Sequence, residues 1–371
     1  MRTLPPRSLT LVVSLVLCGL TAARAEPAKK PGPAPGSFTI DHFKLESGVT
    51  LPKAIVVYGT YGTLNAAKDN AILLPSHYMA QSDGYDLWIG EGRTLDPKKY
   101  FLIMTELFGN SRSSSPSNTP EPFHGPRFPV TTIRDNVEAV RRLLEDGLGV
   151  HHLKAVVGFS MGAEQAFQWA VSHPRFADKI VATAGTARCW PHGVVRLDSQ
   201  IRAITLDPAF KAGDYTAEPT QGIETTGSVW LAWLYSQEWW KRELWKKDPD
   251  AANLTVAQYM AKAATEFFAG ADANNLILQM RTWQAHDVGT TPGFGGSTEK
   301  ALRSITAPVL YMPSETDLYF PLGDARQESA WIRKVTLAPI PSLWGHPAGI
   351  GVTPEDLAFI ERKLHAFLAA P

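Results

Sequence analysis

The chain has 371 residues, 44% of them hydrophobic, which is enough for one large α/β domain with an insertion. Its 36 basic residues balance its 36 acidic residues, and loss of residues 1–25, which hold three arginines and no acidic residue, would leave the rest slightly acidic. This balance gives no indication of a nucleic-acid partner or of attachment to an anionic membrane surface.

The first 25 residues have the pattern of a secretory signal peptide. Arg2 and Arg7 form a basic start, residues 9–20 an apolar segment, and Ala23-Arg24-Ala25 a cleavage site with small residues at both ends. The apolar segment is too short to span a membrane. We therefore expect a secreted or periplasmic protein with no stable membrane insertion after cleavage, followed by a Pro/Gly-rich spacer over residues 26–36.

The sequence has two cysteines, and only one of them would survive cleavage. Cys18 lies where a lipid-anchored precursor carries its cysteine, but Val16 and Leu17 replace the small residues expected before it, so we favour simple cleavage. Lipidation of Cys18 is left open. Cys189 alone cannot form an internal disulfide or a cysteine-based metal site. Beside Trp190, we expect it to be a buried packing residue.

Residues 37–189 form the first part of the expected core. Strands are predicted at 43–51, 54–58, 71–74, 101–105, 155–157 and 180–184. Thr132 is the predicted cap of a helix whose apolar residues share one face, namely Ile133, Val137, Val140 and Leu144. Strands that alternate with helices predict a mostly parallel sheet covered by helices on both faces.

The pattern changes over residues 190–300, where helical patterns replace strand-like runs and predict a helical lid insertion. Thr255 and Gln258 form a capping box ahead of one of these helices. Five tryptophans crowd into one stretch, at positions 230, 233, 239, 240 and 245. Large aromatic residues usually pack, so we expect most of them to hold the insertion on the core, with a role in lining an apolar substrate pocket as the alternative.

Residues 301–371 form the second part of the core. Strands are predicted at 308–312 and 334–337, and an amphipathic helix at 354–368.

The fold is expected to be organised around residues 156–165. Gly158-Phe159-Ser160-Met161-Gly162 follows a β-branched run and precedes helix formers, which is the strand, turn and helix of a nucleophile elbow. A side chain at either glycine would collide with a neighbouring strand or helix. The turn would raise the Ser160 hydroxyl above the sheet, at a helix N-terminus whose amides favour negative charge.

A serine hydroxyl needs a base to take its proton, and the base needs an acid to orient it. In this architecture the partners follow in the order Ser, Asp or Glu, His, on loops after strands. We therefore predict Ser160 as nucleophile, His346 as general base and then general acid, and Asp317 as the orienting acid. Glu315, two residues before Asp317, is the competing acid.

The developing oxyanion needs two backbone donors. One is expected from the amide of Met161, directly after the nucleophile, and the other from the loop over residues 75–79. His77 lies in this loop, where we expect it to position the backbone and not to act as the base.

Several stretches together carry a family resemblance: Tyr61-Gly62-Thr63-Leu64-Asn65, residues 70–78, 101–116 and 135–170, His286-Asp287-Val288, residues 308–321, and Gly345-His346. On these stretches the chain resembles the homoserine O-acetyltransferase branch of the α/β-hydrolase superfamily. The resemblance implies an α/β-hydrolase fold with a helical lid over the site. It also implies a triad of Ser160, Asp317 and His346, with the amides of Met79 and Met161 as the oxyanion hole.

Three stretches depart from these acetyltransferases. Pro347 replaces the aspartate of their Gly-His-Asp, which helps to hold the amino group of homoserine. The segment His77-Tyr78-Met79-Ala80-Gln81 replaces their His-Ala-Leu-Thr-Gly loop, and Gly109-Asn110 replaces a Gly-Gly pair. A secreted enzyme would also meet little acetyl-CoA.

The leading prediction is therefore a secreted serine hydrolase that acts on an ester, or on a lactone or amide, through an acyl-enzyme. An O-acyltransferase of the homoserine type and a non-catalytic binding protein on the same fold are the alternatives. No P-loop, dinucleotide fingerprint or metal-binding histidine pair is present, so we expect no cofactor and no metal. The expected partner is a small acyl substrate, and the oligomeric state stays open, a homodimer included.

Overall fold

The structure, a computed structural model, describes residues 32–370, so the predicted signal peptide lies outside the described residues. Within this range eight strands form one sheet, in the order β1-β2-β4-β3-β5-β6-β7-β8. β1 and β2 pair antiparallel, as do β2 and β4, and all other neighbours pair parallel. The strands are β1 (Ala34–Lys44), β2 (Thr50–Tyr61), β3 (Ala71–Pro75), β4 (Phe101–Thr105), β5 (Ala155–Phe159), β6 (Ile180–Thr183), β7 (Val309–Met312) and β8 (Val335–Leu337). The predicted mostly parallel sheet is confirmed.

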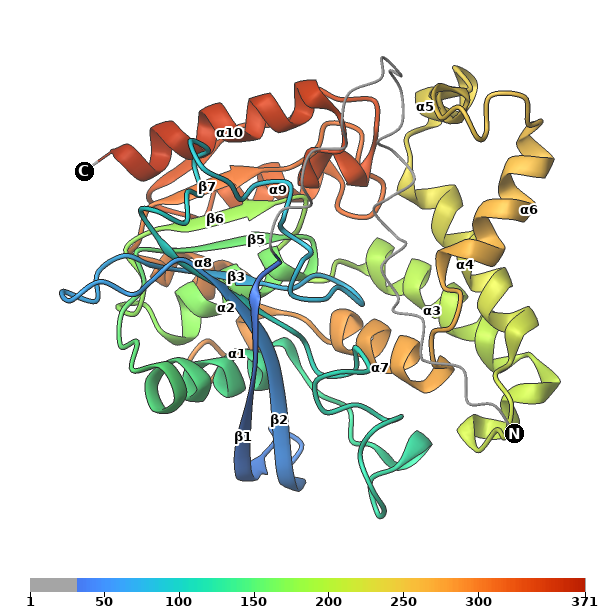
Figure 1. Cartoon of the computed structure of the whole chain (residues 1–371), viewed down its shortest axis with the longest axis horizontal. Helices are drawn as coiled ribbons and strands as arrows, with labels where there is room; N and C mark the ends of the chain where they lie inside the picture. Colours follow the sequence, from blue (N-terminus) through green and yellow to red (C-terminus); the bar gives the residue numbers. More distant parts are fainter. Residues whose placement is uncertain (1–31, 371) are drawn as a thin grey trace.

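Helices cover both faces of this sheet (Figure 1). Those of the core are α1 (Ile133–Arg142), α2 (Met161–Ser172), α8 (Thr298–Ser304), α9 (Leu322–Ser329) and α10 (Pro354–Ala369). Leu73 and Val156 belong to the hydrophobic core on the side of α1 and α2, whereas Ile72 and Val157 belong to the core on the side of α10. Because both faces are buried, the central strands are apolar throughout.

The first predicted strand, over residues 43–51, is wrong. It encloses the turn of the β1–β2 hairpin, in which the Leu45 amide donates to the Val49 carbonyl at 2.8 Å and Gly48 has a φ of 87°. This left-handed conformation favours glycine, so Gly48 allows a turn between β1 and β2. The apolar residues on either side of the turn alone predicted one continuous strand. β1 begins at Ala34, so the last residues of the predicted spacer pair with β2.

Residues 190–300 form the predicted helical insertion, which lies beside the sheet in Figure 1. Its helices are α3 (Pro191–Thr205), α4 (Thr220–Leu234), α5 (Gln237–Lys241), α6 (Val256–Phe267) and α7 (Ala273–Gln284). Short 3-10 or π turns complete the fold at η2 (Gly125–Arg127), η3 (Leu143–Gly147), η4 (Pro208–Gly213), η5 (Leu244–Lys247), η6 (Val288–Thr290) and η7 (His346–Ile350). The predicted caps are confirmed, since both Thr132 and Thr255 form capping boxes.

Two tryptophans of the insertion show packing, and a role in lining a substrate pocket stays a prediction. Trp239 is buried, stacks on Tyr235 and lies 5.8 Å from Trp344 of the core between ring centroids, which holds the insertion on the core. Trp230 instead stacks on Tyr78, with ring centroids 4.5 Å apart, next to the predicted oxyanion loop. Packing therefore accounts for Trp239, and Trp230 lies toward the predicted site.

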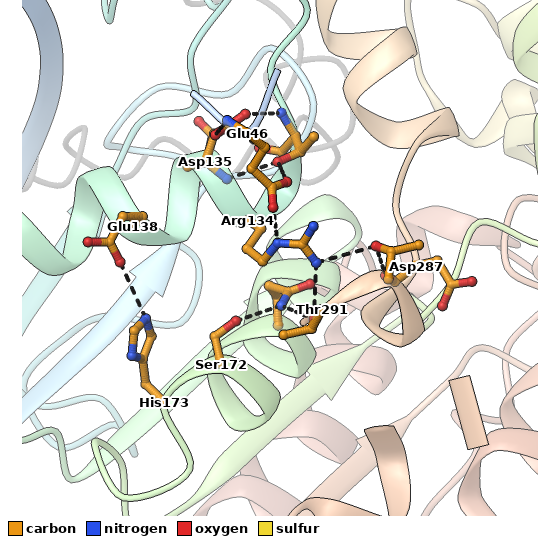
Figure 2. Close-up of polar contacts among 12 residues, drawn as sticks. Glu46, Arg134, Asp135, Glu138, Ser172, His173, Asp287 and Thr291 are labelled. Atoms are coloured by element: carbon orange, nitrogen blue, oxygen red, sulfur yellow. Dashed lines mark hydrogen bonds and ion pairs between the residues drawn. The ribbon is translucent and has the colours of Figure 1, made fainter. Parts of the chain in front are cut away.

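A polar network joins the β1–β2 turn, α1, α2 and the segment that returns from the insertion (Figure 2). Asp135 accepts a hydrogen bond of 2.9 Å from the Glu46 amide. Arg134 contacts the Glu46 carboxylate and donates to the Thr291 hydroxyl at 3.2 Å. Gln168 of α2 donates to the same hydroxyl at 2.9 Å. The end of the insertion is thereby held against α1 and α2.

Cys189, at the entrance of the insertion, is buried as predicted, and burial raises the pKa of its thiol. Across residues 32–370, no helix combines the length and the apolar character that crossing a membrane requires.

Candidate active site

The nucleophile elbow has the predicted backbone geometry. Ser160 stands between β5 and α2 with φ 57° and ψ −126°, a strained conformation for a residue with a side chain. A Cβ at Gly158 would lie 2.0 Å from the Gly162 carbonyl oxygen, and one at Gly162 would lie 2.3 Å from the Pro75 carbonyl oxygen. Only glycine therefore fits at these two positions, which is why the sequence folds into this turn.

The structure brings the three predicted triad residues together. The Ser160 Oγ lies 3.0 Å from His346 Nε2, and His346 Nδ1 lies 2.8 Å from Asp317 Oδ2. All three side chains are buried. This chain of hydrogen bonds can pass the serine proton to the imidazole while the carboxylate fixes the ring orientation.

Asp317 is held in place by backbone donors. Its other oxygen, Oδ1, accepts hydrogen bonds from the amides of Tyr319 at 2.7 Å and Phe320 at 3.1 Å. Glu315, the competing acid, is exposed, and no ion pair or side-chain hydrogen bond joins it to His346 in the part of the chain that the structure describes. The geometry therefore favours Asp317 over Glu315 as the orienting acid.

His346 is positioned by a close turn and by aromatic rings. Gly345, just before it, has a φ of 64°, and a Cβ there would lie 2.6 Å from the Leu234 carbonyl oxygen of α4. The imidazole stacks on Phe159 and lies near Tyr319, with ring centroids 4.8 Å away in both cases. The core and the insertion both fix the base.

The two predicted oxyanion donors differ in their surroundings. Met161 is the first residue of α2, and the first amides of a helix have no acceptor within it. The Met79 amide donates to Gln279 Oε1 at 2.6 Å, while Gln279 Nε2 donates to the Phe108 carbonyl at 3.1 Å. The Met79 amide is thus already hydrogen-bonded to Gln279 in this structure. That the Met79 amide donates to an oxyanion stays a prediction, and it requires Gln279 to share or release this amide.

His77 packs between aromatic rings and not against Ser160. Its ring lies edge-on to Phe159 at 5.1 Å and to Tyr85 at 6.1 Å between centroids. Burial, and then the nearby His346, lower its pKa to about 3. A histidine with this pKa is neutral at physiological pH and a weak proton acceptor, which agrees with the expected positioning role.

Sequence reasoning missed Gln279 and the aromatic wall of the site. Trp283 of α7 stacks on Phe320 with centroids 5.0 Å apart, and Phe320 in turn lies 5.5 Å from the His346 ring. The pair Tyr319-Phe320, two and three residues after Asp317, was the available signal for this wall. For Gln279 no local signal existed, because its partner Met79 is 200 residues away.

No group of three or more His, Cys, Asp or Glu side chains that could hold a metal ion occurs among residues 32–370.

Comparisons with known proteins agree with the fold. A family model described as the alpha/beta hydrolase fold matches residues 73–346. The chain is similar to an ethyl acetate hydrolase from Pseudomonas veronii, with 36% identity over 331 residues that cover 88% of this chain and 93% of that protein. It is also similar to the solved structure of the acetyl esterase MekB, with a TM-score of 0.86, 34% identity, and coverage of 91% and 97%.

The predicted resemblance to homoserine O-acetyltransferases is confirmed as well. The enzyme of that name from Symbiobacterium thermophilum is 30% identical over 356 residues, which cover 87% of this chain and 91% of that one. Esterases and acyltransferases thus stand together among the relatives.

Replacement of Gly158 by alanine should destabilise the protein, because the new methyl group would overlap the Gly162 carbonyl. We expect a loss of roughly 1–3 kcal/mol in the free energy of unfolding, measured by urea titration. Gly323→Ala in α9 is the matched control, since a Cβ there meets nothing within 4 Å. A Gly158→Ala protein as stable as the control would show that the elbow tolerates a side chain.

Replacement of Asp317 by asparagine should lower kcat by on the order of 10⁴, because the amide favours the wrong histidine tautomer. Glu315→Gln should leave kcat within a few fold, since that side chain is exposed. Steady-state hydrolysis of 4-nitrophenyl acetate measures both, with circular dichroism as the check of folding. The reverse pattern would transfer the orienting role to Glu315.

Proposed function

Since the chain belongs to the α/β-hydrolase family, we propose that it is a serine hydrolase that cleaves short-chain carboxylic esters through an acyl-enzyme at Ser160. The observation that carries this proposal is the hydrogen-bonded series from Ser160 through His346 to Asp317. The names of the similar ethyl acetate hydrolase and acetyl esterase support an acetyl or similarly small acyl group. The triad and the substrate are parts of the proposal.

The reaction would proceed in two halves. The Ser160 Oγ attacks the ester carbonyl carbon while its proton passes to His346 Nε2, and a tetrahedral oxyanion forms. The ester C–O bond then breaks, the leaving alkoxide takes the proton from His346, and the alcohol departs. In the second half, water attacks the acyl-Ser160 carbonyl, His346 accepts its proton and returns it to Ser160, and the carboxylic acid leaves.

An O-acyltransferase would use the same acyl-enzyme with an alcohol in place of water. This alternative is supported by the similarity to homoserine O-acetyltransferases. However, a transferase must hold its acceptor, and Pro347, which follows His346, has no side-chain carboxylate to accept hydrogen bonds from an amino group. An ammonium group left without a partner in the site would be strongly disfavoured. We therefore favour transfer to water.

The test incubates the mature protein with a panel of short-chain esters, with and without homoserine and acetyl-CoA. We expect ester hydrolysis, an acyl-Ser160 species visible by mass spectrometry after rapid quenching, and a decay of this species that homoserine does not change. Ser160→Ala should lose labelling by a fluorophosphonate probe and several orders of magnitude in turnover.

Two results would contradict the proposal. Full labelling of the Ser160→Ala protein would place the nucleophile elsewhere. Accelerated decay in millimolar homoserine with formation of O-acyl-homoserine would establish the transferase. If the folded wild-type protein neither labels nor turns over any ester, the non-catalytic binding protein is the remaining alternative.

We also propose that the enzyme acts outside the cytoplasm, on the basis of the signal pattern in residues 1–25. Fractionation of expressing cells should recover a mature form that begins at Glu26 from the medium or the periplasm. N-terminal sequencing measures this directly. A full-length protein in the cytoplasm would overturn the export proposal and would strengthen the case for an acyl-CoA donor.

A further inference from the structure

Arg196 of α3 is a buried cation with unused hydrogen-bond donors. Its side chain belongs to the buried interior, with 2% of the residue exposed. Nη1 donates to Gln200 Oε1 at 3.0 Å, whereas Nε and Nη2 are buried and have no hydrogen-bond partner. A guanidinium group carries five N–H donors and stays protonated in proteins, so it cannot escape this situation by losing its charge.

No carboxylate neutralises Arg196 by direct contact. Among residues 32–370, no ion pair within 4.0 Å includes it, and Asp317 directs its carboxylate to His346 and to two backbone amides. Glu164 of α2 lies within electrostatic range, but its two oxygens are also without partners, and burial raises its pKa well above the usual value. Neither oxygen of Glu164 forms a hydrogen bond with the guanidinium group.

Aromatic faces surround the guanidinium. Its Cζ lies 4.0 Å from the ring centroid of Tyr319, 4.5 Å from that of Trp283 and 5.6 Å from that of Trp230. Cation–π contact stabilises the charge, and more so at a desolvated site. The aromatic rings contact the flat face of the guanidinium group, however, and the N–H groups of Nε and Nη2 at its edge remain without hydrogen-bond acceptors.

This arrangement lies one aromatic layer from the catalytic histidine. Tyr319 contacts both Arg196 and His346, the latter with ring centroids 4.8 Å apart. Trp283 contacts Arg196 on one side and stacks on Phe320, which faces His346, on the other. Arg196 and His346 therefore both contact Tyr319, and the unpaired donors of Arg196 lie close to the proposed site.

We propose that Arg196 determines specificity by binding a carboxylate carried by the ester substrate, and this inference rests on the proposed ester hydrolysis. The planar fork of a guanidinium matches a carboxylate with two parallel hydrogen bonds. A buried, unpaired charge is strongly unfavourable, and an anionic substrate group would supply the missing partner. The carboxylate sits on the acyl chain or on the alcohol part, and these two positions define the arms of the test.

The experiment compares kcat/KM for charged and neutral esters of similar size. Monoethyl succinate against ethyl butanoate tests a carboxylate on the acyl side, and 3-acetoxypropanoate against propyl acetate tests one on the alcohol side. We expect the wild-type protein to prefer the charged ester in one arm. Arg196→Met should lower kcat/KM for that ester by roughly 10- to 100-fold, as expected for the loss of hydrogen bonds to a charged group, and should change the neutral ester little.

Two variants complete the design. Arg196→Lys keeps the charge without the fork and should fall between wild type and Arg196→Met. Arg202→Met is the control, because Arg202 is exposed on the same helix and pairs with Asp198. It should leave all four substrates unchanged.

Two outcomes would overturn the inference. The first is a wild-type protein with no preference for the charged ester in either arm. This result would reject carboxylate binding by Arg196 even if the Arg196→Met protein does not fold. The second is an equal loss for charged and neutral esters in a folded Arg196→Met protein, which would make the residue a packing element. Hydrolysis of the neutral esters and fluorophosphonate labelling test the proposed ester hydrolysis without involving Arg196. A failure of the proposed function can therefore be told apart from a failure of the inference about Arg196.

Discussion

The structure depends on backbone segments that approach one another more closely than any side chain would permit. At the elbow, Gly158 meets the carbonyl of Gly162, and Gly162 meets the carbonyl of Pro75 at the end of β3. Gly185, after β6, lies so close that a Cβ would be 2.5 Å from the Ser160 carbonyl oxygen. Three parallel strands and α2 are thus fixed around one serine, whose strained backbone is maintained by this surrounding contact.

Sequence could predict the features that local pattern determines. Ser160 between two glycines predicts the elbow, and the order of Asp317 and His346 on loops after strands predicts the hydrogen-bonded arrangement that these three side chains have in the structure. The β1–β2 hairpin was missed because apolar residues flank Gly48 on both sides and concealed the turn. Gln279 and Arg196 could not be found at all, since their surroundings are assembled from helices and loops far apart in the chain, and only the tertiary structure reveals an amide or a charge in need of a partner.

The core and the insertion contribute to the site in different ways. The proposed triad residues Ser160, Asp317 and His346 all come from the core, where they follow β5, β7 and β8. The insertion supplies aromatic rings near them, through Trp230 of α4 and Trp283 of α7, and Arg196 of α3 lies behind this aromatic layer. The relatives include proteins named as ester hydrolases and proteins named as O-acetyltransferases, and the fold alone does not decide between these activities.

The single cysteine of the chain beyond residue 25 has a practical consequence. Cys189 is buried, and burial raises the pKa of its thiol, which disfavours the reactive thiolate. Thiol reagents should therefore not modify the folded protein at this residue. A cysteine introduced at an exposed position of the insertion, such as Val256 on α6, would then be the sole accessible thiol of the mature chain. A fluorophore or spin label attached at that position would report the movement of the insertion relative to the core without any change to the native thiol.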